Sequence, residues 1–228
     1  MTYWDRLEKY RRQGPQAAGK LELRPAEEFR GVVGDLFDSR LQPLGWSRSR
    51  GLQWKRQGTQ PWAEEVVDLQ SLKNGVGIRW GLRLSFVPPL VEQKRPRPLD
   101  WSYDPFDYER NPSGWTFSRF ATDEELRLQA DEVMPRVIPE LRSMSECARD
   151  LVALASCFEA KRNRRHVRLG FHQYPQEGTA YAAVLGLIGR EAEGLEILAA
   201  VCERLELLGP DRERLQLVMR DLWRSGPP

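Results

Sequence analysis

The side chains that could act as acids, bases or nucleophiles are few in this sequence. Its two histidines, His166 and His172, lie in one short segment, and only a cysteine distant in sequence could meet either of them. Catalysis by a Ser/His/Asp or Cys/His group needs a histidine that a third group holds beside the nucleophile, and no spacing in the sequence indicates that arrangement. We therefore expect no enzyme of these classes.

Three cysteines, Cys147, Cys157 and Cys202, fall in stretches with helical periodicity. Their number is odd, and no pair has the C-x-x-C spacing of a redox or zinc motif. The pattern favours structural thiols in a reducing cytosol over a redox or metal-binding role.

Two groups of carboxylates could also do chemistry. Glu64, Glu65 and Asp68 could supply a pair for general acid and base catalysis, but nothing in the sequence indicates that they enclose a pocket. The three aspartates of segment 100–107 could hold a hard cation through oxygen ligands. Because their spacing fits no EF-hand and prolines crowd them, we expect no metal site.

Nucleotide-binding motifs are missing from the sequence. It contains no P-loop and no G-x-G-x-x-G after a strand. Gly75-Val76-Gly77 lies in a hairpin, where we expect Gly75 to serve the turn. The sequence therefore predicts no catalytic residue and no cofactor.

Segment 99–115, LDWSYDPFDYERNPSGW, interleaves large aromatic rings with carboxylates. Aromatic rings supply contact area at little conformational cost and carboxylates can meet a basic partner, so the pattern is typical of a protein-binding surface. The other interpretation is that the rings cap the sheet. The predicted partner-binding residues come from this segment and from the polar face of a preceding strand: Trp101, Tyr103, Asp104, Phe106, Asp107, Tyr108, Arg79 and Arg83.

Segment 161–168, KRNRRHVR, is the dense basic run of the chain. Such a run could neutralise phosphates, which makes nucleic-acid binding the alternative function. A solvated helix end is the other interpretation, because cations near a helix C-terminus complement its dipole. The residues of the nucleic-acid alternative are Arg162, Arg164, Arg165 and Arg168.

The element that must position the two sheet arginines is a predicted β-hairpin over residues 62–86. Its second strand alternates, with apolar side chains from Val76 to Phe86 on one face and Arg79 and Arg83 on the other. Alternation of this length indicates a strand with one buried face and one polar face.

The hairpin loop is expected at Asn74-Gly75, a dipeptide that tolerates the positive φ values of a type I′ turn. In that register Asp68 lies opposite Gly81 and diagonal to both arginines. We therefore expect cross-strand ion pairs on the polar face.

Further elements must cover this hairpin, since a lone hairpin is marginal in water. Residues 51–57 alternate as a preceding strand, residues 115–120 could form a fourth, edge strand, and apolar residues from Pro25 to Leu41 have helical spacing. The predicted class is α+β, with an N-terminal helix packed on an antiparallel sheet of three or four strands and followed by a C-terminal group of helices.

Two capping boxes predict helix starts in the second half of the chain. Thr122 with Glu125 starts the first helix, and the pattern recurs over 143–146. We expect Pro135 and Pro139 to kink or interrupt the first helix, because each removes an internal hydrogen bond.

From Thr179 the pattern is helical to the end. Gly209-Pro210 stops one apolar stripe, and Asp211 is expected to cap a final helix. Bends are expected near Gly186, Gly189 or Gly194.

Composition is that of an ordinary globular protein. The 228 residues include 35 basic and 33 acidic side chains, so the net charge of +2 gives no general argument for nucleic acid. The first residues have no apolar signal region, and nowhere do eighteen apolar residues run together. We expect a cytoplasmic protein without a membrane span, organised as an arm (1–24), a helix-and-sheet region (25–120) and a helical region (121–228).

The span from Phe29 to Phe86 resembles a bacterial family that is known as a domain of unknown function. The resemblance rests on a helix that ends in Leu41–Trp46 (LQPLGW), then Trp54-Lys-Arg, Val67–Gln70 and Val76–Trp80. It implies a small cytoplasmic α+β protein. Because some members are encoded near polymorphic toxins, it also implies an immunity role, and it carries over no catalytic residues.

Together these features predict a non-enzymatic protein-binding protein, of which a toxin-neutralising immunity protein is the specific form. Its partner would be a protein, such as a toxin domain. The sequence leaves the oligomeric state open.

Overall fold

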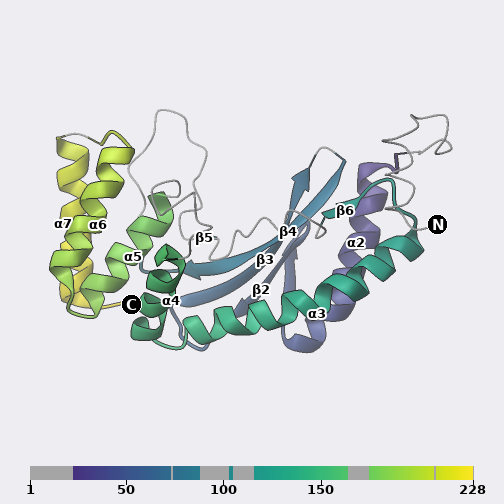
Figure 1. Ribbon diagram of the computed structural model, residues 1–228, viewed down its shortest axis with the longest axis horizontal. Helices are drawn as coiled ribbons and strands as arrows, with labels where there is room; N and C mark the ends of the chain where they lie inside the picture. Colours follow the sequence, from purple (N-terminus) through teal and green to yellow (C-terminus); the bar gives the residue numbers. More distant parts are fainter. Residues whose placement is uncertain are drawn as a thin grey trace. The chain divides into compact units, whose positions relative to one another are not determined.

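The computed structural model describes residues 23–72, 74–87, 103–104, 116–163, 175–207 and 209–227, without the side chains of 103, 104, 116, 161–163 and 175–177 (Figure 1). The chain forms two compact units. Unit 1 takes in residues up to Arg56, Val67–Arg79 and Glu109–Leu141, and unit 2 takes in Gln57–Val66, Trp80–Tyr108 and Arg142–Pro228. The expected N-terminal arm lies outside the described residues except for Leu23 and Arg24.

The strands form one sheet and confirm the α+β class. The order β1-β2-β3-β4-β5 follows the sequence, and β6 also pairs with β4. The sheet is therefore larger than the expected three or four strands. The bounds are β1 Ser47–Arg50, β2 Gln53–Gln57, β3 Ala63–Leu72, β4 Gly75–Leu84, β5 Tyr103–Asp104 and β6 Thr116–Ser118.

The sequence missed β1 and β5 for different reasons. All four residues of β1 are exposed, so this edge strand has no apolar alternation to reveal it. Strand β5 is two residues long and lies inside the segment that we expected to be a loop. The expected edge strand over 115–120 is present as β6.

The central hairpin forms with a register different from the expected one. Strand β3 ends at Leu72 and β4 begins at Gly75, so Gly75 belongs to the strand and not to the loop. The N–H of Ser85 donates to the carbonyl of Trp62 at 2.9 Å. This contact and the Asp68–Arg79 ion pair fit a shift of two residues, which keeps every side chain on its expected face.

Gly75 has a packing role in place of the expected turn role. Its residue partner on β6 is Ser118, and a Cβ built on Gly75 would lie 2.0 Å from the carbonyl oxygen of Phe117. Its φ is not among the positive ones. Glycine is therefore required here because another backbone approaches closely.

In unit 1, helix α2, Ala26–Leu41, packs on the strands. Phe37 is fully buried and lies 5.3 Å from the ring of Trp54 and 5.4 Å from that of Phe117. The indole N–H of Trp54 donates to Asp38 at 2.6 Å, which satisfies a polar group at the edge of the core. The short helix η1, Gln42–Leu44, follows and ends at Gly45, whose φ is 83°.

Helix α3, Asp123–Cys147, begins as predicted but continues further than expected. The N–H of Thr122 donates to the Glu125 carboxylate at 2.8 Å and the N–H of Glu125 donates to the Thr122 hydroxyl at 3.3 Å, which confirms the first capping box. Pro135 and Pro139 lie inside the helix on its exposed side, where water can satisfy the carbonyls they leave free.

The predicted helix start over 143–146 is wrong, because these residues lie inside α3. The next helix, α4, runs from Leu151 to Asn163. Asp150 caps it by accepting the N–H of Ala153 at 2.7 Å.

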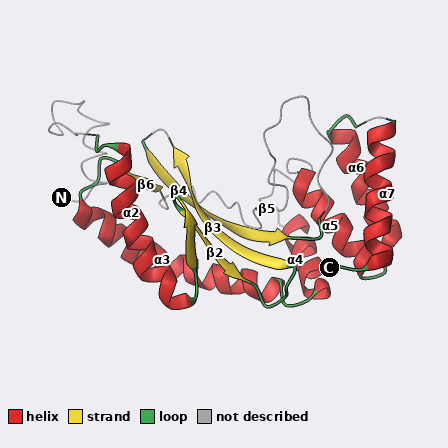
Figure 2. Cartoon of the chain, turned by 180° about the vertical axis from the view of Figure 1, so that it is seen from behind, coloured by secondary structure: helices red, strands yellow, loops and turns green. Residues whose placement is uncertain are grey.

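The C-terminal helices are α5 Pro175–Leu187, α6 Glu191–Arg204 and α7 Pro210–Ser225, and they lie side by side in both views (Figures 1 and 2). Gly189, at a φ of 84°, separates α5 from α6, so one of the three expected bend positions is the break. Gly209, not the expected Asp211, occupies the N-cap position of α7.

Helix α5 is the centre of this group. Every residue from Gly178 to Gly186 is buried, which is the behaviour of a helix surrounded on all sides. The ring of Trp223 on α7 covers Gly186, and its indole N–H donates to the carbonyl of Ala183 at 3.2 Å. Small residues on α5 thus let a large ring dock.

Helix hydropathy bears on the predicted absence of a membrane span. Among the helices that the structure describes, none combines the length and the apolar character needed to cross a bilayer.

Candidate partner-binding site

The two arginines of the predicted surface lie on β4 and are both half-buried. Arg83 donates to the carboxylate of Glu64 on β3 at 2.8 Å. Arg79 forms an ion pair with Asp68, also on β3. Of the expected cross-strand pairs, Asp68–Arg79 is present, whereas Arg83 pairs with Glu64 and not with Asp68. Each arginine thus has an acidic partner within the sheet.

Strand β5 brings part of the aromatic segment to Arg83. Tyr103 is the residue partner of Arg83, and Asp104 is the partner of Leu82. Strand β5 is the last in the sheet order and also contacts α5. Three predicted partner-binding residues, Tyr103, Asp104 and Arg83, thus come together at one edge of unit 2.

The remaining residues of the predicted surface are not placed. Their side chains fall outside the ranges that the structure describes: Trp101, Phe106, Asp107 and Tyr108. For these residues the binding surface stays a prediction.

The basic segment of the nucleic-acid alternative is described only at its start. Arg162 belongs to the last turn of α4, but its side chain is not described. Arg164, Arg165 and Arg168 lie outside the described residues, as do both histidines. Nucleic-acid binding by this segment stays a prediction.

The carboxylates considered for acid and base catalysis do not gather into one site. Glu64 is half-buried and pairs with Arg83, whereas the adjacent Glu65 is 1% exposed on the opposite face of β3. Asp68 pairs with Arg79. In the part of the chain that is described, no group of three His, Cys, Asp or Glu residues is arranged to hold a metal ion.

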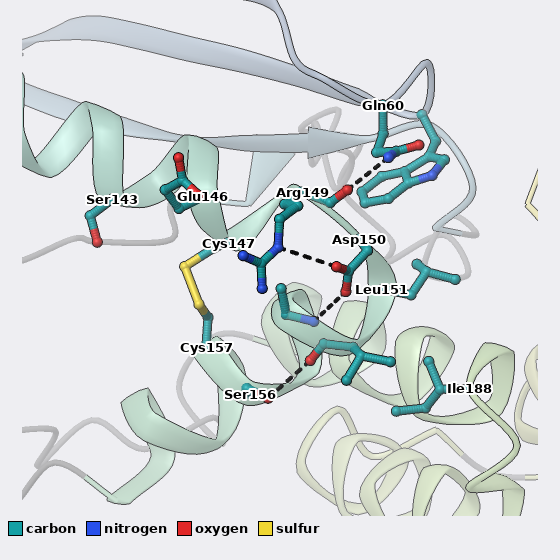
Figure 3. A pocket seen from close by; sticks show the side chains of 13 residues that line it. Gln60, Ser143, Glu146, Cys147, Arg149, Asp150, Leu151, Ser156, Cys157 and Ile188 are labelled. Carbon is teal, nitrogen blue, oxygen red and sulfur yellow. Dashed lines mark hydrogen bonds and ion pairs between the residues drawn. A yellow bond between two sulfur atoms is a disulfide. The ribbon is translucent and has the colours of Figure 1, made fainter.

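Unit 2 also contains an open hollow of about 880 Å³ that the sequence did not indicate (Figure 3). It lies where α3 turns into α4. Gln60 and Trp62 line it from the connection before β3, and Ile188 lines it from just after α5. The remaining lining comes from Ser143, Glu146, Cys147, residues 149–153, Ser156 and Cys157.

Polar contacts fix the turn beneath this hollow. The side-chain amide of Gln60 donates to the carbonyl of Arg149 at 2.7 Å, and Arg149 contacts Asp150 at 3.3 Å. The N–H of Ala153 donates to Asp150 and, together with Arg149, holds the pKa of that carboxyl below its usual value. The carboxylate is therefore charged and committed to capping α4.

A disulfide between Cys147 and Cys157 borders the hollow, with Cα atoms 5.9 Å apart. This overturns the expectation that all three cysteines are free thiols. The predicted helix starting over 143–146 would have held both residues, and ten residues of helix span about 15 Å. Because α3 ends at Cys147 and the chain turns, the two side chains meet.

Cys202 is the free cysteine, and it is fully buried on α6. Burial raises the pKa of its thiol above the usual value. Here the prediction of a structural thiol agrees with the environment.

One signal in the sequence could have located this hollow, although the predictions above did not use it. Asp150 followed by the apolar run Leu151-Val152-Ala153-Leu154 has the form of an N-cap before a helix. Taking Asp150 as the start would have ended the preceding helix near Cys147 and brought the cysteines to one corner.

Comparison with protein-family models, curated proteins and solved structures finds no match to this chain. The functional argument therefore depends on the geometry described above and, for the toxin form alone, on the sequence resemblance.

Proposed function

We propose that this chain is a non-enzymatic protein-binding protein whose partner contacts the sheet edge formed by β5 and the segment that contains it. The observation that carries the proposal is the pairing of β5 with β4, which puts Tyr103 beside Arg83. A tyrosine and an arginine at one place are the residue types that most often dominate binding energy at protein interfaces.

The position of β5 in the sheet also supports the proposal. Among the strands that the structure describes, β5 is the last in the order, and edge strands are common places for another chain to dock. Since β5 is two residues long, side chains more than main-chain pairing must supply the contact.

The charges in this region indicate which partner would fit. Segment 99–115 carries Asp100, Asp104, Asp107 and Glu109, with Arg110 as its single basic residue. Arg83 does not add a net positive charge, because Glu64 neutralises it. The partner surface should therefore be basic, with apolar patches for the aromatic rings.

The specific form that we propose is toxin neutralisation. The resemblance of the span 29–86 to a family with toxin-associated members implies this form. Many enzymes that cleave nucleic acids are basic. A basic toxin domain of this kind would match an acidic and aromatic docking segment.

A photo-crosslinking residue at position 103 tests the site assignment in cells that produce the chain. We expect one protein to be crosslinked from position 103 and none from position 217, an exposed site on α7. The toxin form adds that the crosslinked protein arrests growth when it is expressed alone, and that this chain restores growth. Crosslinking from position 217 alone, or from neither position, would contradict the proposal.

A further inference from the structure

The disulfide of unit 2 is open to the surrounding solution. Cys147 and Cys157 are both half-buried, and both line the hollow at the turn between α3 and α4. Figure 3 shows the disulfide at the side of this hollow and the Arg149 side chain extending into it. A reagent that enters the hollow therefore reaches the two residues that form the disulfide.

The corner has other contacts that hold it when the disulfide is absent. Asp150 caps α4 at 2.7 Å, and Gln60 holds the carbonyl of Arg149 at 2.7 Å. The N–H of Ala148 donates to the carbonyl of Met144 at 3.2 Å in the last turn of α3. These bonds do not involve sulfur, so the turn can persist after the cross-link is broken.

The charged side chains that line the hollow are Arg149, Asp150 and Glu146, and Arg149 pairs with Asp150 at 3.3 Å. The guanidinium of Arg149 is two residues from Cys147 and extends into the same space. Asp150 and Glu146 also border the hollow, so an uncharged dithiol suits it better than an acidic one.

We propose that Cys147–Cys157 is a thiol-exchange site, a disulfide that a small neutral dithiol reaches through the hollow and opens while the protein stays folded. One thiolate of the dithiol attacks a sulfur of the protein, the protein S–S bond breaks, and one cysteine leaves as a thiolate that takes a proton from water. The second thiolate of the reagent then attacks the mixed disulfide and releases the other cysteine. The protein gains two electrons and two protons, and the dithiol is oxidised to its own disulfide.

The test treats the oxidised full chain with dithiothreitol at neutral pH without denaturant, blocks free thiols with an alkylating reagent at intervals, and locates the labels by peptide mass spectrometry. We expect labels at Cys147 and Cys157 that appear together, at a rate proportional to dithiol concentration. The buried Cys202 serves as the internal control and should stay unlabelled until the protein is unfolded.

Four results would overturn the proposal. Labelling of Cys147 and Cys157 before any dithiol is added would show that the cross-link is not formed. Labelling of Cys202 at the same rate as the other two, or a rate independent of dithiol concentration, would show that reduction needs unfolding. No labelling under native conditions would show that the disulfide is sealed.

Two variants test whether the dithiol reaches the disulfide through the hollow. Ser156→Phe adds bulk to an exposed residue that lines the hollow, and it should slow exchange severalfold. Leu217→Phe adds bulk at an exposed position outside the hollow and should leave the rate unchanged. Equal rates in the two variants would contradict access through the hollow. Comparing dithiothreitol with a dithiol protein then tells whether a small molecule or a protein is the faster source of the thiolate.

Discussion

Replacing Gly186 by alanine tests how α7 is docked on α5. A Cβ at position 186 would lie 2.1 Å from Cε2 of Trp223 and 2.2 Å from its Cδ2 and Nε1. No relaxation of a few tenths of an ångström removes that overlap, so the ring must leave its place. The hydrogen bond from the indole N–H to the carbonyl of Ala183 must then break as well.

The expected loss of stability comes from the apolar contacts and the hydrogen bond that the Trp223 ring loses. Trp223 is half-buried, and uncovering about 100 Å² of apolar surface costs roughly 2–3 kcal/mol. The lost hydrogen bond costs about 1 kcal/mol. Alanine in place of glycine in a helix returns about 1 kcal/mol. We therefore expect Gly186→Ala to lower the free energy of unfolding by about 2 kcal/mol.

Urea unfolding followed by circular dichroism measures this free energy, and two controls make the result specific. Gly31 in α2 has nothing within 4 Å of its built Cβ, so Gly31→Ala should stabilise by roughly 0.5–1 kcal/mol. In a Trp223→Ala background the overlap is absent, and Gly186→Ala should then change from destabilising to stabilising.

The outcome that would refute this reasoning is a Gly186→Ala variant as stable as the original chain. Equal destabilisation with and without Trp223 would also refute it, because the cost would then come from some other contact.

Two further predictions concern a strand glycine and a helix cap. Gly75→Ala should destabilise by about 2 kcal/mol, since its Cβ meets the Phe117 carbonyl at 2.0 Å, whereas Gly77→Ala, with its nearest contact at 3.5 Å, should be neutral or stabilising; equal effects in urea unfolding would contradict the close approach. The pKa of Asp150 is lowered in the folded state, first by the N–H of Ala153, so its stabilising effect is present above the usual value of 3.8 and is lost as pH falls through the lower folded value. As pH is lowered from neutral to acidic values, the melting temperature of Asp150→Asn should thus fall less than that of the original chain, because asparagine still caps α4 but does not titrate. An equal fall in both proteins would contradict this role of Asp150.

The elements that sequence could predict are those whose residues carry a local signal. Strand β4 is visible because Trp80, Leu82 and Leu84 alternate with polar positions, and all three are buried. The start of α3 is visible because Thr122 and Glu125 satisfy each other's backbone N–H groups. Such signals depend on residues that are close in sequence, so they can be recognised without knowing the rest of the fold.

The elements that sequence missed depend on contacts between distant residues. Nothing in the tetrapeptide of β1 predicts a strand, because all of its side chains are exposed and its pairing with β2 alone defines it. Pro135 and Pro139 suggested an interruption, yet α3 continues because both prolines face solvent. Gly75 was expected in the hairpin loop, but it pairs with Ser118 of β6, a residue far away in sequence.

The candidate site was predicted in part for the same reason. Alternation placed Arg83 on the polar face and indicated Asp68 as its acidic neighbour, but the two-residue register shift gives Arg83 the partner Glu64. The pairing of Tyr103 with Arg83 joins residues that are far apart in sequence, and no local pattern predicts it. The hollow went unpredicted because it depends on where α3 ends.

The most direct test of the central claim measures the affinity of the crosslinked partner for the purified chain. Calorimetric titration should give at least about 30-fold weaker binding for the triple variant Trp101→Ala, Tyr103→Ala and Asp104→Ala, since interface aromatics often contribute about 2 kcal/mol each. The double variant Leu217→Ala and Val218→Ala, on the exposed side of α7, should bind as the original chain does. A triple variant that is folded and binds with unchanged affinity would contradict the claim that this protein uses the β5 edge to hold its partner.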